Sequence, residues 1–339
     1  MIPVIAKLLD GTSLSRDEAR EAMDAIMRGE ATPAQIGGFL VALRLKGETV
    51  DEIVGCAEAM REHVVGVRPR RDDLVDTAGT GGDGGRTFNI STAAALVAAA
   101  AGAAVAKHGN RAVSSASGSA DVLEALGFQL EQPAERIERS IDELGFGFLF
   151  APTHHPAMRH AAPVRRELAA RTVFNVLGPL TNPAGARAQL VGVYSPDLVR
   201  TIASVLARLG ARRAFVVHGA GSIDELSPAG PNLVCEVVDG EVRRREIDPL
   251  ELGIPRCDPE ELRGGSPEEN AAAIRSVFEG ANGGRRDAIL LNAAGAIAAA
   301  GHARDLAEGL GYAREAVESG AAAGRLEELI AFSRAGSDA

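Results

Sequence analysis

The chain is poor in the features that build disulfide frameworks, zinc sites and membrane spans. Its 339 residues include three cysteines, which lie far apart and form no C-x-x-C pair. Neither a disulfide framework nor a cysteine-based zinc site is therefore expected. No apolar run approaches the roughly 20 residues that cross a bilayer. The first residues also lack the apolar core of a signal peptide. We expect a protein of the reducing cytoplasm without a membrane partner.

Net positive charge and lysine are also scarce. The formal net charge of −10 argues against a nucleic-acid partner. Of the 36 basic residues only three are lysine, namely Lys7, Lys46 and Lys107. Because arginine replaces lysine almost everywhere, a lysine kept inside a dense polar motif indicates a role that the wide guanidinium fork would not fill. Lys107 stands in such a motif.

The most informative stretch is DTAGTGGDGGRTFNIST, from Asp76 to Thr92. Its glycines allow close approach of the backbone to a ligand, and the alanine-rich helix expected after it, from Thr92 to Gly102, presents unpaired N–H groups. This combination is typical of a phosphate site. The letters from Gly79 fit G-x-G-x-x-G, but the acid that a dinucleotide fold needs roughly 20 positions later is missing. A flexible glycine loop without a ligand is the alternative.

The pattern of elements predicts an α/β protein that begins with a small all-α domain. Residues 1–67 form helices, with a capping box at Ser15. Residues 72–339 form a large domain in which a mostly parallel central sheet has helices on both faces. Strands are expected near residues 74–75, 103–106, 146–150, 190–194 and 214–218, followed by a hairpin of 232–238 and 241–247.

Two further segments carry expectations about how the domains join. One helix is expected from Ala157 to Ala170, and a Gly/Pro/Asn-rich connection from Arg171 to Pro183. That connection is expected to pass between the domains and to act as a hinge. Part of the 165–188 segment is expected to return to the small domain.

A second polar cluster runs from Lys107 to Asp121, directly after an expected strand. The carboxyl ends of strands are where open α/β sheets bind ligands. A serine-rich loop that only caps the next helix, through Ser119 or Asp121, is the alternative.

Asp224 and Glu225 follow the fifth expected strand in a glycine-rich loop. Adjacent carboxylates in such a loop suit Mg²⁺ that also coordinates phosphate oxygens, although an ordinary charged turn has the same composition.

His154 and His155 are adjacent, so they cannot share a helix face as metal ligands, and loop positions are favoured over a zinc pair. No nucleophile–base pair for acyl transfer is evident. A phosphorylated or pyrophosphorylated substrate, positioned and stabilised by charge, is therefore favoured.

In combination these motifs resemble the anthranilate phosphoribosyltransferase family. The resemblance covers essentially the whole chain and follows the family's order of motifs. It rests on DTAGTGGD from Asp76, NIST from Asn89, KHGNR from Lys107, RTVFNVLGPLTNP from Arg171, and VHG from Val217 followed by Asp224-Glu225. It implies a small helical domain, a larger α/β domain that binds 5-phosphoribosyl-1-pyrophosphate, an active site near the hinge, and a homodimer formed through the small domain.

The resemblance also implies an activity, the second step of tryptophan synthesis from chorismate. The enzyme would transfer the 5-phosphoribosyl group from 5-phosphoribosyl-1-pyrophosphate to the amino group of anthranilate, with Mg²⁺ as cofactor. The products would be N-(5-phosphoribosyl)anthranilate and pyrophosphate. No catalytic acid or base is assigned, because the aniline nitrogen is already neutral before attack.

Carried over residue by residue, the resemblance implies three sets of site residues. The set for 5-phosphoribosyl-1-pyrophosphate is Gly79, Gly82, Asp83, Thr87, Asn89, Ile90, Ser91, Thr92, Lys107, His108, Gly109, Asn110, Arg111, Ala112, Val113, Ser114, Ser115 and Ser119. The set for Mg²⁺ is Ser91, Asp224 and Glu225. Anthranilate would contact Gly79, Asn110 and Arg165, with Arg165 on its carboxylate, and His108 with residues 154–156 would form the wall of its channel. Lys107 would act as a point charge on phosphate.

Two other functions are weighed against this one. A pyrimidine nucleoside phosphorylase of the same broad fold should carry a base-binding motif in place of Arg171–Pro183, and none is evident. A non-enzymatic relative that binds nucleic acid should have lost Asp224 and Glu225 and should carry a basic face. Both carboxylates are present, and the net charge is −10.

Overall fold

A computed structural model describes residues 1–81, 87–112 and 116–335. Five of the site residues expected above, Gly82, Asp83, Val113, Ser114 and Ser115, lie outside these described residues.

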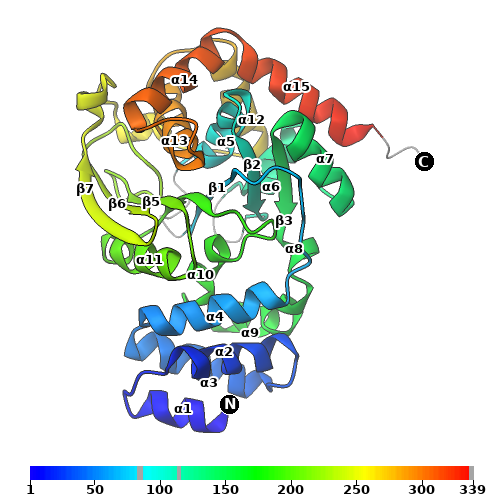
Figure 1. The fold of residues 1–339 in the computed structure, drawn as a ribbon, viewed down its shortest axis with the longest axis vertical. Coiled ribbons are helices and arrows are strands. Elements are labelled where there is room, and N and C mark those ends of the chain that lie inside the picture. Colours follow the sequence, from blue (N-terminus) through cyan, green and yellow to red (C-terminus); the bar gives the residue numbers. More distant parts are fainter. Residues whose placement is uncertain (82–86, 113–115, 336–339) are drawn as a thin grey trace.

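Four helices at the N-terminus form the small domain, drawn in blue in Figure 1: α1 (Ile2–Leu9), α2 (Arg16–Met27), α3 (Pro33–Lys46) and α4 (Val50–Glu62). Capping boxes at Ser15, Thr32 and Thr49 fix where α2, α3 and α4 begin. α2 packs on α4 and α1 packs on α3. These contacts bury Met23, Phe39 and other apolar side chains completely.

The larger part of the chain is built on a seven-stranded sheet with the order β3-β2-β1-β4-β5-β6-β7. The strands are β1 (Leu74–Gly79), β2 (Ala104–Gly109), β3 (Phe146–Phe150), β4 (Ala188–Gly192), β5 (Arg213–His218), β6 (Asn232–Val238) and β7 (Glu241–Ile247). The first five are parallel, and β6 and β7 form the antiparallel hairpin. The predicted fold class is confirmed.

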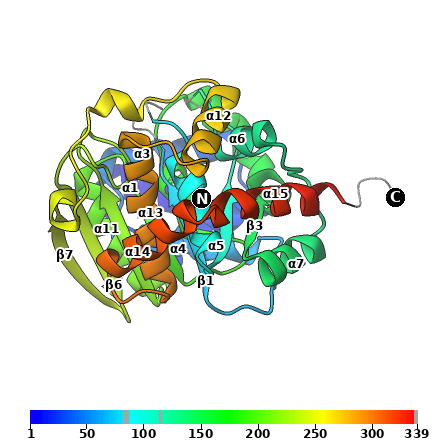
Figure 2. The same ribbon diagram turned by 90° about the horizontal axis from the view of Figure 1, so that it is seen from above.

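Helices cover both faces of this sheet, as Figure 2 shows from above. On one face, α5 (Ile90–Ala100) and α13 (Gly284–Ala300) pack against the strands. The same apolar core includes α6 (Ser119–Leu126), α12 (Pro267–Phe278), α14 (Leu306–Glu318) and α15 (Ala321–Arg334), which pack on these two helices and on one another. The opposite face packs against α7 (Ala134–Leu144) and α11 (Pro196–Arg208). α5 and α13 are rich in alanine, and this low side-chain volume lets both helices lie close to the strands. None of the described helices has the length and apolar character needed to cross a bilayer.

The segment between β3 and β4 differs from the expectation. The single helix predicted from Ala157 to Ala170 is wrong: a 3₁₀ turn, η1 (Pro156–His160), is followed by α9 (Ala162–Leu168). Pro163, in the first turn of α9, explains the break, because proline cannot donate to the preceding turn and fits the start of a new helix. The remaining turns are α8 (Ala151–His154), α10 (Phe174–Leu177) and η2 (Gly178–Leu180).

This same segment contacts the small domain: α9 packs on α3, and α10 packs on α4. In Figure 1, α10 lies between α4 and the sheet, and α9 lies beside the small-domain helices. Ala161, Val164 and Phe174 share one apolar cluster with the small-domain helices. The linker that leaves the small domain is held nearby. The Val65 N–H donates to His154 O at 2.8 Å, and His154 Nδ1 donates back to Val65 O at 2.8 Å. The domain limits 1–67 and 72–339, and the hinge, stay predictions.

Candidate active site

The carboxyl ends of the parallel strands bring the two polar motifs and the acidic pair to one edge of the sheet. Gly79, the last residue of β1, lies opposite Gly192 of β4, and Gly192 lies opposite Val217 of β5. The loop after β5 carries Asp224 and Glu225 back toward β1. The expected phosphate loop and the expected metal ligands, which are far apart in the sequence, therefore meet.

Asp224 and Glu225 both accept hydrogen bonds from the first motif. Asp224 Oδ2 accepts from the Gly81 N–H at 2.8 Å, and Glu225 Oε1 accepts from the Ser91 N–H at 3.2 Å. Ser91 lies in the first turn of α5, so one carboxylate sits at the positive end of that helix. The structure thus brings together Ser91, Asp224 and Glu225, the three residues expected to hold Mg²⁺.

Glycine is required where Asp224 approaches the strands. A Cβ on Gly79 would lie 2.3 Å from Asp224 Oδ2, and a Cβ on Gly192 would lie 1.5 Å from Asp224 O. Neither space admits a methyl group without moving the acidic loop. Gly79 therefore has a structural role in placing Asp224, and its contacts with substrate stay a prediction.

Lys107 is buried, with 1% of its surface exposed. Its ammonium donates to Thr77 O at 2.5 Å, to Thr77 Oγ1 at 3.2 Å and to Ser91 Oγ at 3.4 Å. Burial lowers the pKa of Lys107, and the nearby carboxylates of Asp76 and Glu225 oppose that shift. The ammonium is therefore adjacent to the expected metal ligands, and its contact with phosphate stays a prediction.

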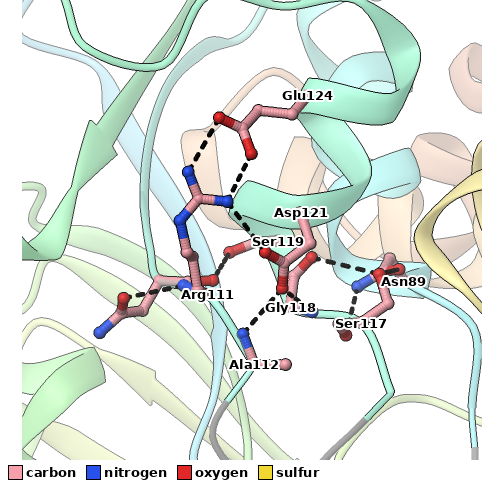
Figure 3. Close-up of polar contacts among 9 residues, drawn as sticks. Asn89, Arg111, Ala112, Ser117, Gly118, Ser119, Asp121 and Glu124 are labelled. Atoms are coloured by element: carbon pink, nitrogen blue, oxygen red, sulfur yellow. Dashed lines mark hydrogen bonds and ion pairs between the residues drawn. The ribbon is translucent and has the colours of Figure 1, made fainter.

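The second motif is held by the start of α6, as Figure 3 shows. Asp121 accepts hydrogen bonds from the Ala112 N–H at 2.8 Å and the Gly118 N–H at 2.9 Å. Arg111 forms ion pairs with Asp121 at 3.1 Å and with Glu124. These ion pairs fix the guanidinium of Arg111, and with it the start of the second motif, against α6. Ser119 Oγ donates to Asn110 O at 3.3 Å and so joins residue 110 to the start of α6.

Asn89 links this second motif to the first. Its Nδ2 donates to Ser117 O at 3.1 Å, and Ser117 Oγ donates to Asn89 Oδ1 at 3.0 Å. The same Oδ1 accepts from Asn270 Nδ2 at 2.9 Å. The expected site residues Thr87, Ile90 and Thr92 flank Asn89 along the chain.

Arg165 is a partly buried cation. Its guanidinium lies over the Phe174 ring at 5.0 Å from the centroid, and burial lowers its pKa. Within the described ranges its guanidinium has no hydrogen bond or ion pair with another residue. A planar cation in this condition suits a carboxylate ligand.

His108 and His155 lie side by side, with ring centroids 4.9 Å apart. His108 Nδ1 donates to Gly178 O at 3.2 Å. Burial, together with the neighbouring His155, lowers the pKa of His108 to about 3. Burial also lowers the pKa of His155 to about 4. Both rings are therefore neutral near physiological pH, and their place in an anthranilate channel stays a prediction.

In the described part of the chain no three His, Cys, Asp or Glu side chains are grouped to hold a metal ion.

The connection 171–183, which is expected to be a hinge, contacts the site through hydrogen bonds to Asp76. This buried carboxylate accepts from the His108 N–H at 3.1 Å and from Asn182 Nδ2 at 2.8 Å. Burial raises the pKa of Asp76 to about 6, against the effect of Lys107 and these hydrogen bonds. Asn182 Nδ2 also donates to Ala106 O at 2.8 Å, so residues 178–182 are held against β1 and β2.

Sequence reasoning missed two asparagines of the C-terminal helices. Asn270 on α12 contacts Asn89, and Asn292 on α13 binds the backbone of Leu226, directly after the acidic pair. Asn292 Nδ2 donates to Leu226 O at 2.7 Å, and its Oδ1 accepts from the Leu226 N–H at 2.9 Å. Asn292 has a signal in the sequence, because it stands inside the apolar run of α13, where a polar side chain needs a partner. Asn270 follows Glu268 and Glu269 at the start of α12 and has no such signal.

Known protein families match the chain along nearly its full length. The model described as "Glycosyl transferase family, a/b domain" matches residues 71–323, and the one described as "Glycosyl transferase family, helical bundle domain" matches residues 2–64. The anthranilate phosphoribosyltransferase of Anaeromyxobacter dehalogenans strain 2CP-C is 57% identical over 96% of this chain and 97% of its own. This chain belongs to the anthranilate phosphoribosyltransferase family.

Solved structures of the family have the same fold. The anthranilate phosphoribosyltransferase of Thermus thermophilus has a TM-score of 0.93 at 52% identity and covers 98% of this chain and 99% of its own. The enzyme of Saccharomyces cerevisiae, in complex with PRPP and Mg, has a TM-score of 0.89 at 29% identity, covering 98% of this chain and 97% of its own.

Proposed function

We propose that this chain transfers the 5-phosphoribosyl group of 5-phosphoribosyl-1-pyrophosphate to the amino group of anthranilate, releasing pyrophosphate. The reaction is the second step of tryptophan synthesis from chorismate. The observation that carries the proposal is the convergence of Asp224 and Glu225 on Gly81 and Ser91. It places two carboxylates beside a glycine-rich loop and a helix N-terminus, as a pyrophosphate with its metal requires.

The acidic residues suit Mg²⁺. Two carboxylates and the hydroxyl of Ser91 are hard oxygen ligands, and Mg²⁺ in proteins is commonly held by one or two carboxylates together with substrate phosphates. We assign Ser91, Asp224 and Glu225 to it. When bound, Mg²⁺ would neutralise the charge that develops on the leaving pyrophosphate.

The protein's own groups bind and orient the substrates. The positive end of the α5 dipole, at Ser91, favours a phosphate group placed beside it. Arg165 pairs with the anthranilate carboxylate, because its guanidinium lacks a carboxylate partner among the described residues. The amine needs no base before attack. His108 and His155, neutral beside the connection 171–183, form an uncharged wall for an aromatic ring.

We also propose that two copies associate through the small domain. α1 and α3 pack together and expose Ile2, Leu9, Val41 and Leu45, with Leu45 81% exposed. Exposed apolar side chains on adjacent helices are typical of an association surface, and a second copy offers the same surface. The division into 1–67 and 72–339 then separates an association domain from a catalytic one.

Cys56, Cys235 and Cys257 are free thiols, which is consistent with a cytoplasmic location.

The proposed activity is tested by the loss of anthranilate fluorescence on mixing with the purified protein. Fluorescence should fall only when 5-phosphoribosyl-1-pyrophosphate and Mg²⁺ are both present. A protein that leaves anthranilate unchanged under these conditions, yet cleaves a pyrimidine nucleoside with inorganic phosphate, would be the phosphorylase alternative instead.

A further inference from the structure

Three polar side chains form a bridge from α12 to both substrate-binding motifs. The bridge consists of Asn270, Asn89 and Ser117. Asn270 is 3% exposed and uses both ends of its amide. Its Nδ2 donates to Asn89 Oδ1 at 2.9 Å, and its Oδ1 accepts from the Gly265 N–H at 2.8 Å. Asn89 completes the bridge through its two hydrogen bonds with Ser117.

Because it belongs to this bridge, the Asn89 side chain does not cap α5, although its position at the start of that helix suggests a capping role. Asn89 is the N-cap of α5, where an asparagine oxygen usually accepts a hydrogen bond from the second or third N–H of the helix. Its side chain makes no such bond. Its Oδ1 is instead occupied by Asn270 and Ser117. The side chain of Asn89 therefore links the two motifs, and the Ser91 N–H in the first turn of α5 donates to Glu225 instead.

The segment before α12 supports the same region from outside. The Phe88 N–H donates to Leu262 O at 3.0 Å, and Thr87 pairs with Arg263 in an isolated β-bridge. A Cβ on Gly264 would lie 2.6 Å from Thr87 O, so the two backbones are in close contact. The end of the first motif is thus packed against residues 262–270. Within that contact, the buried amide of Asn270 is the group that reaches Asn89.

We infer that Asn270 is a positioning residue for 5-phosphoribosyl-1-pyrophosphate. By fixing the amide of Asn89, it sets the spacing between the N-terminus of α5 and the backbone at Ser117. A ligand that contacts both the N-terminus of α5 and the backbone at Ser117 is sensitive to that spacing. Anthranilate, whose carboxylate is placed on Arg165 outside both motifs, is much less sensitive. This inference rests on the proposed function for the identity of the ligand.

The substitution Asn270→Asp replaces only the donor Nδ2 of Asn270 by an oxygen. The carboxylate keeps an acceptor for the Gly265 N–H, but its second oxygen cannot donate to Asn89 Oδ1, so two acceptors face each other. Turning the amide of Asn89 to repair this contact would face its oxygen toward Ser117 O. The KM for 5-phosphoribosyl-1-pyrophosphate should rise about tenfold, and the KM for anthranilate should stay within about twofold.

Ser333→Ala is the matched control. Ser333 is also buried, at 3% exposure, and its hydroxyl accepts from the Gln129 N–H and donates to Ile330 O. Its loss should lower the melting temperature without changing either KM. If Asn270→Asp changes both KM values in the same proportion, or neither, the positioning role is wrong.

Hydrogen–deuterium exchange gives a readout that needs no turnover. In Asn270→Asp, peptides that contain residues 87–92 and 117–121 should exchange faster together, and in Ser333→Ala they should not. Unchanged exchange in both peptides would overturn the bridge, even if the wild-type protein consumed no anthranilate. A wild-type protein that is inactive but shows the coupled exchange would instead reject the proposed function and keep the bridge.

Discussion

Replacing Gly79 with alanine puts one methyl group into space that Asp224 occupies. The new Cβ would lie 2.3 Å from Oδ2 and 3.1 Å from Cγ of Asp224. Non-bonded heavy atoms rest at about 3.5 Å, so the carboxylate must move by about 1 Å. The same Oδ2 accepts the Gly81 N–H at 2.8 Å, and this hydrogen bond would be lost as the oxygen moves. Gly79 is not among the residues with positive φ, so alanine adds no backbone strain.

A displacement of about 1 Å at a reacting group costs about a hundredfold in rate. We therefore expect Gly79→Ala to lower kcat/KM about a hundredfold and to raise the Mg²⁺ concentration for half-maximal activity. The assay is anthranilate fluorescence over a Mg²⁺ titration. Gly324→Ala is the control, because Gly324 lies on the exposed side of α15 with nothing within 4 Å of an added Cβ. Wild-type kinetics and Mg²⁺ dependence in Gly79→Ala would refute the role of Asp224.

Four more outcomes are expected. Asp224→Asn with Glu225→Gln should reduce Mg²⁺-dependent turnover by at least about a hundredfold with the far-ultraviolet circular dichroism unchanged; activity equal to wild type at limiting Mg²⁺ would remove the metal assignment. Arg165→Ala should raise the KM for anthranilate about tenfold or more, and an effect confined to 5-phosphoribosyl-1-pyrophosphate would contradict it. Burial holds the pKa of His108 at about 3, below its usual 6.5, so the unfolded state binds more protons and stability falls as pH drops through that window. His108→Asn should flatten this slope in urea unfolding, and an unchanged slope would argue against a buried neutral ring. Leu45→Glu should shift sedimentation toward the monomer, and an unchanged oligomeric state would place the interface elsewhere.

Most of the sheet was predictable because β1 to β6 are short, mainly apolar runs bounded by turn residues. The charged and exposed β7 was predictable from the Asp239-Gly240 turn that joins it to β6. The strand expected at 146–150 matches β3, and the hairpin at 232–238 and 241–247 matches β6 and β7. Alternation of these strands with helices was enough to predict their parallel arrangement. The single helix predicted over 157–170 failed because Pro163 lies inside that range and begins a new helix.

The acidic pair was predictable from adjacency, whereas the contacts that hold it were not. Lys107 reaches Thr77 and Ser91 because of the register between β1 and β2 and the placement of α5. Asn270 and Asn89 are 181 residues apart in the chain. No local pattern relates two such positions, because their contact exists only after α12 packs beside α6.

The most direct test of the proposed reaction is ³¹P nuclear magnetic resonance of the complete mixture. The protein is incubated with anthranilate, 5-phosphoribosyl-1-pyrophosphate and Mg²⁺. We expect pyrophosphate and a new phosphomonoester to appear in equal amounts, each equal to the anthranilate consumed. Release of pyrophosphate that does not depend on anthranilate, or consumption of anthranilate without pyrophosphate, would contradict the transfer.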